Sequence, residues 1–185
     1  AASAAPNATQ IDEYKKILDD KSIQAVVIAT PTHKHKDLVI EVLQAGKHVY
    51  CEAPIANTIE DAKAIAMAAK QHKKQVFQAG LQSRSDPQRH YVLGFMRTGA
   101  AGTPLFARSQ FHKKQSWRQP AATAEREKDL NWRLDSEISL GLIGEIGIHQ
   151  LDAATWFLNS RPIAVTGFGS TLHWTDDGRT VPDTV

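Results

Sequence analysis

The sequence lacks several features that would place it in other protein classes. Its single cysteine, Cys51, excludes an intramolecular disulfide and is compatible with a reducing compartment. No apolar run approaches the length that crosses a bilayer, so no membrane partner is expected. Lys and Arg are dispersed among Asp and Glu at a formal net charge of +2, which does not favour nucleic acid. We therefore expect a globular protein, and no metal site.

The sequence also lacks a glycine-rich dinucleotide loop and an initiator methionine. No Gly-x-Gly-x-x-Gly pattern occurs, and the partial match Gly167-Phe168-Gly169 continues into a strand-like stretch instead of opening a helix. The chain opens on an alanine-rich lead at 1–7 and stops within an extended pattern at 184–185. We expect a segment of a longer protein that is cytoplasmic, or periplasmic if an upstream signal is removed.

The most informative stretch that is present runs from Ala25 to His35. Four apolar residues, three of them β-branched, lead towards Thr30-Pro31-Thr32, and a helical pattern begins directly afterwards. This order predicts a strand buried on both faces, then a turn and a helix. In a doubly wound sheet, ligands bind outside the carboxyl ends of the strands, so the turn is expected at a binding edge.

Strand and helix patterns alternate through the first hundred residues. The expected order is helix 11–20, strand 23–30, helix 35–45, strand 48–51, helix 57–72 and strand 76–79. Alternation at such short spacing predicts parallel βαβ units with right-handed crossovers. We therefore expect the partial Rossmann domain of an α/β protein over residues 1–101.

The pattern changes after Gly102. We expect a strand at 104–111, a long polar connection at 112–138, a helix at 148–158 and a strand at 163–174. Long strands separated by one helix indicate an α+β domain over 102–185, with a mostly antiparallel open sheet.

Five short motifs follow one another along the chain. They are Ala29-Thr30-Pro31 with His35, Ala45-Gly46-Lys47-His48-Val49, Cys51-Glu52-Ala53-Pro54, Gly80 with Arg84 and Pro87, and Gly147-Ile148-His149 with Asp152. Their order and spacing resemble the Gfo/Idh/MocA oxidoreductases over about residues 11–185. The resemblance implies a Rossmann domain that binds NAD or NADP. It also implies a C-terminal domain that carries a sugar or polyol site and forms a homo-oligomer through its sheet.

The resemblance assigns the cofactor to the turns after two of the predicted strands. The implied contacts are Thr30, Pro31, Thr32, His35, Glu52, Ala53 and Pro54. The glycine-rich phosphate loop and the acid that binds the cofactor ribose would lie upstream. His35 has a second interpretation, as part of the first polar turn of a helix.

The chain departs from the family at Ala53. The family has Glu-Lys-Pro here, and its lysine helps to move a proton from the substrate hydroxyl, whereas this chain has Glu52-Ala53-Pro54. A methyl group neither donates nor accepts a proton, so the task passes to another group, to water, or is lost. Three explanations stay open: an engineered replacement, a natural branch with another acid/base arrangement, and a cofactor-binding protein with little activity.

The resemblance makes His149 the group that takes the hydroxyl proton. Glu145 stands where the family usually has Asp, four residues earlier. Helical i, i+4 spacing would put the two side chains on one face, so we expect Glu145 to orient the imidazole and favour its protonated form. Without the resemblance, His149 also fits a core histidine on an apolar helix.

Substrate contacts are expected from three residues of the second half. Trp132 and Arg133 offer a stacking plane and a fork of donors for a sugar, although packing beneath a long loop would suit them as well. Asp152 either anchors the substrate or pairs locally with Arg161.

The sequence thus predicts an NAD(P)-dependent oxidoreductase that acts on a hydroxyl of a sugar or cyclic polyol. Because the family lysine is replaced by Ala53, two alternatives remain. One is a redox-neutral glycosidase that retains NAD, and the other is a non-catalytic cofactor-binding relative.

Overall fold

The computed structural model describes residues 5–185, and the start of the alanine-rich lead, at 1–4, lies outside them. The elements are α1 (Tyr14–Asp19), β1 (Ala25–Ile28), η1 (Thr32–Lys34), α2 (His35–Gln44), β2 (His48–Glu52), α3 (Ile59–Gln71), β3 (Phe77–Gly80), η2 (Gln82–Ser85), α4 (Pro87–Arg97), α5 (Ala124–Leu130), η3 (Trp132–Leu134), η4 (Ile143–Gly147) and α6 (Ile148–Leu158). Most η elements are 3-10 turns, but η4 is a π-helical turn. The order up to β3 confirms the predicted alternation of strands and helices.

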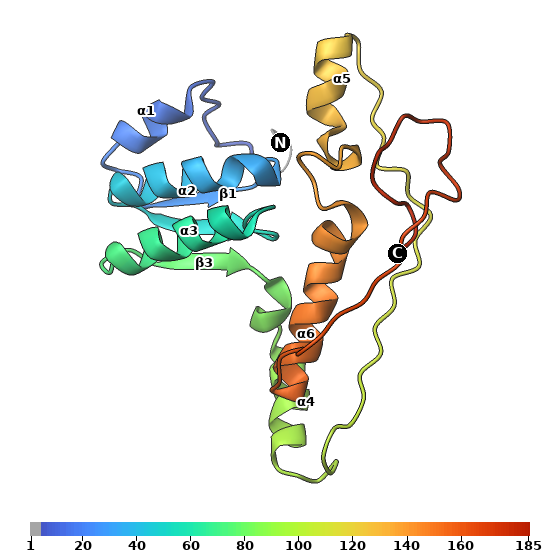
Figure 1. Ribbon diagram of the computed structural model, residues 1–185. Helices are drawn as coiled ribbons and strands as arrows, with labels where there is room; N and C mark the ends of the chain where they lie inside the picture. Colours follow the sequence, from blue (N-terminus) through green and yellow to red (C-terminus); the bar gives the residue numbers. More distant parts are fainter. Residues whose placement is uncertain (1–4) are drawn as a thin grey trace.

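The three strands form one parallel sheet in the order β1-β2-β3 (Figure 1). Ile28 at the end of β1 lies opposite Cys51, and Glu52 at the end of β2 lies opposite Gly80. All three strands therefore end at one edge of the sheet, which confirms the predicted parallel βαβ arrangement and the α/β class of this half.

The main core lies between the sheet and helices α2 and α3. Apolar side chains of both helices meet those of β1 and β2 there, namely Ile28, Val39, Val42, Leu43, Val49, Cys51, Ile65 and Ala68. The start of α3 is fixed by Thr58, whose hydroxyl accepts the Asp61 N–H at 3.1 Å, a usual N-cap. This packing holds the strand ends, and the turns that follow them, in fixed positions.

The prediction that β1 is buried on both faces is wrong. Val27 is 70% exposed, whereas its neighbour Ile28 is 4% exposed. Successive side chains of a strand point to opposite faces, and α2 and α3 cover one face of this sheet (Figure 1). Val27 points to the opposite face, which is left open at this position.

The antiparallel sheet predicted for residues 102–185 is also wrong. Neither 104–111 nor 163–174 forms a strand, and the pairing in this half is an isolated bridge between Ser170 and Thr184. A strand needs a hydrogen-bonding partner along its length, and these two segments do not provide one for each other. They run as extended chain on one side of the helices α4 to α6 (Figure 1).

Helices α4 and α5 were not predicted from the sequence. Asp86 caps α4 by accepting the Gln88 N–H at 2.9 Å, and Pro87 occupies the first position of this helix. An Asp-Pro pair is a strong start signal for a helix, so α4 could have been recognised. The short α5 lies within the predicted polar connection and begins after its own cap, Thr123.

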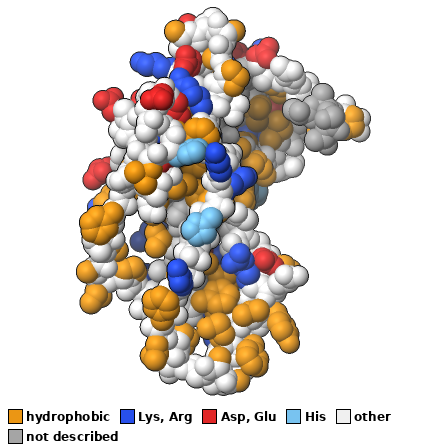
Figure 2. Space-filling model, turned by 90° about the vertical axis from the view of Figure 1, so that its right-hand side faces the viewer, with side chains coloured by type: hydrophobic (Ala, Val, Ile, Leu, Met, Phe, Trp, Pro, Cys, Tyr) orange, Lys and Arg blue, Asp and Glu red, His pale blue; other side chains and the backbone are white. Residues whose placement is uncertain are grey.

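Large apolar side chains stand exposed on the extended segments of the second half. Figure 2, which views the molecule from the side of these segments, shows hydrophobic side chains gathered on the lower part of this face. The most exposed are Leu105, Phe106, Ile163, Val165 and Phe168. None of the helices in residues 5–185 combines the length and the apolar composition that a bilayer crossing requires.

Candidate functional site

The turns after β1 and β2 lie together at the carboxyl edge of the sheet. His35, 1% exposed at the start of α2, lies between them. Its Nε2 is 2.8 Å from the Thr30 carbonyl oxygen, and its Nδ1 is 3.0 Å from the Pro54 carbonyl oxygen. Carbonyl oxygens only accept, so at least one ring nitrogen donates in any tautomer, and both donate when the ring is protonated. We call the joined turns, 30–32 and 52–54, the edge wall.

Gly80 allows the end of β3 to lie against this wall. A Cβ at Gly80 would stand 2.8 Å from the Glu52 Cα and 3.0 Å from the Ala53 nitrogen. Backbone atoms cannot yield to so close an approach without moving the turn. Close packing against the turn therefore requires a glycine at position 80. The peptide bond between Ala53 and Pro54 in this turn is cis.

Glu145 connects the edge wall to the second half of the chain. Its side chain is 8% exposed, on the π-helical turn η4. One carboxylate oxygen accepts from the Thr32 hydroxyl at 3.2 Å, and the other accepts from Nε of Arg133 at 2.8 Å. The Arg133 guanidinium lies over the ring of Trp132, 4.4 Å from its centre. Thr32, Glu145, Arg133 and Trp132 thus form a chain of contacts between the halves.

A cavity of about 560 Å³ opens between the edge wall and this chain of contacts. Predicted residues from both halves line it, namely Thr30, Thr32, His35, Glu52, Ala53, Trp132, Arg133 and Glu145. We call it the edge cavity. The structure therefore brings most of the predicted cofactor and substrate residues together. His149 and Asp152 are not among the lining residues.

The predicted contact between Glu145 and His149 is wrong. Both Glu145 oxygens are already bonded, one of them to the Arg133 cation, and such charge-assisted bonds are stronger than neutral ones. The Nδ1 atom of His149 is buried and has no hydrogen-bond partner among the described residues. Glu145 and Ile146, about one turn earlier, line the edge cavity.

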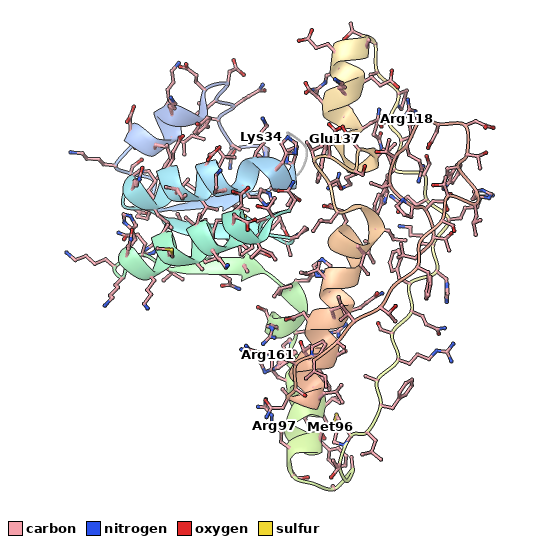
Figure 3. The ribbon with its side chains drawn as sticks, in the orientation of Figure 1. Lys34, Met96, Arg97, Arg118, Glu137 and Arg161 are labelled. Atoms are coloured by element: carbon pink, nitrogen blue, oxygen red, sulfur yellow. The ribbon has the colours of Figure 1, made fainter. Side chains whose placement is uncertain are left out.

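Asp152 is bound by Arg84, so the predicted local pair with Arg161 is wrong. Arg84 follows β3, and its Nε lies 2.9 Å from each Asp152 oxygen while Nη2 lies 2.7 Å from Oδ1. The same guanidinium stacks 5.2 Å from the ring centre of Trp156. Arg161 lies beyond the end of α6 (Figure 3). The Arg84 pair ties α6 to the loop after β3, outside the edge cavity.

Trp132 has the packing role that the sequence left open. It is 6% exposed, and the His33 ring meets it edge-on with 5.9 Å between the ring centres. Burial lowers the pKa of His33, and the nearby charges of Lys34 and His35 lower it further. Trp132 thus presents little surface to a ligand and mainly supports Arg133.

Several lining residues of the edge cavity come from the extended segment before α5, where the sequence carries no motif. Among them are Lys113, Gln115 and Gln119. Gln119 is held by Asn131, which accepts its N–H at 2.7 Å and donates to its carbonyl at 3.0 Å. The neighbouring Arg118, which is labelled in Figure 3, forms an ion pair with Glu127 of α5. The segment is therefore anchored beside the cavity, although it has no regular structure.

Comparison with known proteins connects both halves to one family. A model of the oxidoreductase family with an NAD-binding Rossmann fold matches residues 1–80, and a model of the GFO/IDH/MocA C-terminal domain matches residues 90–185. Levoglucosan dehydrogenase of Pseudarthrobacter phenanthrenivorans is 33% identical over 147 residues, which cover 79% of this chain and 36% of that protein. The scyllo-inositol 2-dehydrogenase (NAD(+)) of Bacillus subtilis is 29% identical over 162 residues, or 88% of this chain and 43% of that protein.

A solved structure of levoglucosan dehydrogenase in complex with NADH and levoglucosan superposes with a TM-score of 0.67. It is 28% identical, over 85% of this chain and 42% of that one. The chain spans about two-fifths of the length of the curated relatives it matches. With both family models matched in order along its length, the chain belongs to the Gfo/Idh/MocA oxidoreductase family.

Proposed function

We propose that this chain is part of an NAD(P)-dependent oxidoreductase that converts a hydroxyl group of a sugar or cyclic polyol to a carbonyl group. The edge cavity carries this proposal, because turns at the carboxyl edge of a parallel sheet face polar side chains from the second half across one space. Levoglucosan and inositol, named for the relatives, are polyhydroxylated rings. A polar cavity of about 560 Å³ suits such rings.

The edge wall fits one end of a dinucleotide. Thr30 and Glu52 are exposed at the strand ends and line the cavity, whereas His35 lies behind them and fixes the turns. We assign the wall of the cofactor site to the seven residues implied above, Thr30, Pro31, Thr32, His35, Glu52, Ala53 and Pro54. These residues would hold NAD(P), which would supply the acceptor for the hydride.

Arg133 is the proposed substrate-binding residue. Its side chain is 45% exposed, and its contact with Glu145 uses Nε, which leaves two terminal nitrogens to donate to hydroxyl groups. The ring of Trp132 stacks against this guanidinium and helps to hold it in place. We propose that Asp152 acts at a distance from the substrate, by holding α6 through Arg84.

His149 is the proposed acceptor of the hydroxyl proton. Support comes from its buried Nδ1, which no group among residues 5–185 satisfies, and from its place just after Glu145 and Ile146. Imidazole is the usual proton acceptor near neutral pH. Glu145 is proposed as a positioning residue that holds Arg133 and Thr32.

The test uses the purified full-length protein with NAD⁺ or NADP⁺ and, in turn, levoglucosan, myo-inositol and scyllo-inositol. We expect net formation of reduced cofactor, measured at its absorbance band, and its loss in His149→Ala. The control is His72→Ala, since His72 ends α3 at the opposite edge of the sheet. Release of an aglycone from aryl glycosides without net reduced cofactor would favour the redox-neutral glycosidase. If neither reaction is observed, the result would favour the alternative of a non-catalytic cofactor-binding relative.

We further propose a domain boundary near residue 102, a homo-oligomer and a cytoplasmic location. The exposed apolar side chains of the extended segments support an oligomer, because patches of this kind are usually covered by another surface. The unpaired cysteine is compatible with the cytoplasm. Light scattering of the full-length protein tests the oligomer, and a monomeric mass would contradict it.

A further inference from the structure

This inference rests on the proposed function and concerns the group that Ala53 cannot supply. Oxidation of a hydroxyl group builds negative charge on its oxygen as the proton leaves. A preorganised cationic donor beside that oxygen stabilises the charge. Ala53 lines the edge cavity with a methyl group, so any such donor has to come from another lining residue.

The other ionisable side chains that line the edge cavity have partners, are neutralised or point elsewhere. Both ring nitrogens of His35 face carbonyl oxygens, and the charge of Arg133 is balanced by the Glu145 carboxylate, so its free terminal nitrogens can bind hydroxyl groups but offer no net positive charge. The carboxylate of Glu52 turns towards β3, since its Oε2 lies 2.8 Å from the position that a Cβ at Gly80 would take. As a carboxylate it would in any case repel a forming alkoxide.

Lys113 is the remaining ionisable residue of the lining. Its side chain is exposed, and no hydrogen bond or ion pair to another of the residues 5–185 is formed. Its segment is held three residues later, where Nη2 of Arg179 donates to the Ser116 carbonyl oxygen at 2.9 Å. Lys113 also lines a larger neighbouring cavity, which shares part of its lining with the edge cavity, whereas the next residue, Lys114, lines only the larger one. The edge cavity, which Ala53 also lines, is thus bordered by one lysine without a partner among residues 5–185.

We propose that Lys113 supplies, from the second half of the chain, the cationic donor that is missing at position 53. Its ammonium group donates a hydrogen bond to the reacting hydroxyl oxygen while the O–H proton passes to His149. The O–H electron pair becomes the second bond of the carbonyl group, and the C–H pair leaves as hydride to the bound cofactor. Lys113 keeps its charge throughout, so the alcohol loses one proton and one hydride.

The experiment compares Lys113→Met with Lys114→Met in the full-length protein, using the polyol that is oxidised in the assay above. Loss of one preorganised donor lowers kcat by about 100-fold or more, so we expect this loss in Lys113→Met and wild-type kcat in Lys114→Met. The double variant Ala53→Lys with Lys113→Met should regain most of kcat. A purely structural role of Lys113 would not be rescued by a lysine at another position.

A second readout does not depend on turnover. Acetic anhydride acetylates lysines, and mass spectrometry reports the extent at each position. We expect NADH together with the same polyol to slow acetylation of Lys113 and to leave that of Lys114 unchanged. Wild-type kcat in Lys113→Met, failed rescue by Ala53→Lys, or unprotected Lys113 would each overturn the assignment. A wild-type protein that reduces no cofactor would instead overturn the proposed function, and the assignment with it.

Discussion

The pair between Arg84 and Asp152 should contribute measurably to the stability of the protein. We consider the variants Arg84→Gln and Asp152→Asn, singly and together. The single variants break the pair, and the double variant removes both partners, so the cycle isolates the coupling energy between them. A structural role for Asp152 predicts a sizeable coupling, whereas a substrate anchor would not need one.

The size of the coupling follows from geometry and exposure. Two unit charges about 4 Å apart attract by about 1 kcal/mol in bulk water and by about 4 kcal/mol at an effective dielectric constant of 20. The Asp152 side chain is 12% exposed, but Arg84 is 45% exposed, so water screens the pair substantially. Exposed pairs give about 0.2–1 kcal/mol, and the two-pronged geometry here raises the expected coupling to about 1–2 kcal/mol.

Urea unfolding of the four proteins, followed by circular dichroism, measures this energy. Arg84→Gln should cost about 0.5 kcal/mol more than Asp152→Asn, because it also removes the stacking on Trp156. The pair between Arg126 and Asp129, 3.9 Å apart with side chains 62% and 70% exposed, is the control and should show coupling near zero. A coupling below about 0.3 kcal/mol for Arg84 and Asp152 would refute the reasoning. A rise in KM caused by Asp152→Asn but not by Arg84→Gln would also refute it, because it would indicate that Asp152 anchors the substrate.

Three further outcomes are expected. Gly80→Ala should lower the free energy of unfolding in urea by about 1–3 kcal/mol, because the added Cβ would press on the backbone of Glu52. The control is Gly94→Ala, whose Cβ would meet open space and should not destabilise the protein. Equal effects of the two substitutions would contradict the packing argument. Cys51 should resist iodoacetamide at about pH 8 until urea unfolds the protein, since burial, aided by the charge of Glu52, raises its thiol pKa to about 12; rapid labelling of the folded protein would disagree. The pKa of His33 is lowered in the folded protein, so on acidification the unfolded chain binds a proton at this residue at a higher pH than the folded protein does. The stability contributed by neutral His33 is therefore complete above the ordinary pKa of 6.5 and declines as the pH falls below it. The urea midpoint of the wild type should therefore fall more between about pH 7.5 and 5.5 than that of His33→Phe, and equal falls would speak against this.

The first half of the fold could be predicted because its signals are local. Apolar runs such as 25–28 and the glycine at 46 fix where strands and helices begin and end, and parallel strands then bring Thr30 and Glu52 to one edge. The strands expected in the second half depend on pairing with other strands, which is not a local signal. The composition of 163–174 shows that these residues would suit a strand, but not whether a partner strand is present, and the strand-type pairing of this segment is limited to the bridge between Ser170 and Thr184.

The sequence predicted which residues would meet where a motif lay on a strand end, and it missed contacts that join distant parts of the chain. Asp152 carries no sign in the sequence that Arg84, 68 residues earlier, will bind it. Glu145 likewise turns to Thr32 and Arg133 because tertiary packing brings a hydroxyl and a cation to its two oxygens. Lys113 belongs to no motif, and only the cavity singles it out.

The imidazole of His35 has a consequence for redesign of the proposed cofactor site. The His35 ring contacts the carbonyl oxygens of both Thr30 and Pro54, so a shift of one turn is expected to move the other. An engineer who reshapes the first turn to change cofactor preference will also displace the second. Libraries that vary 30–32 and 52–54 together, with His35 kept, should therefore yield more working variants than libraries that vary either turn alone.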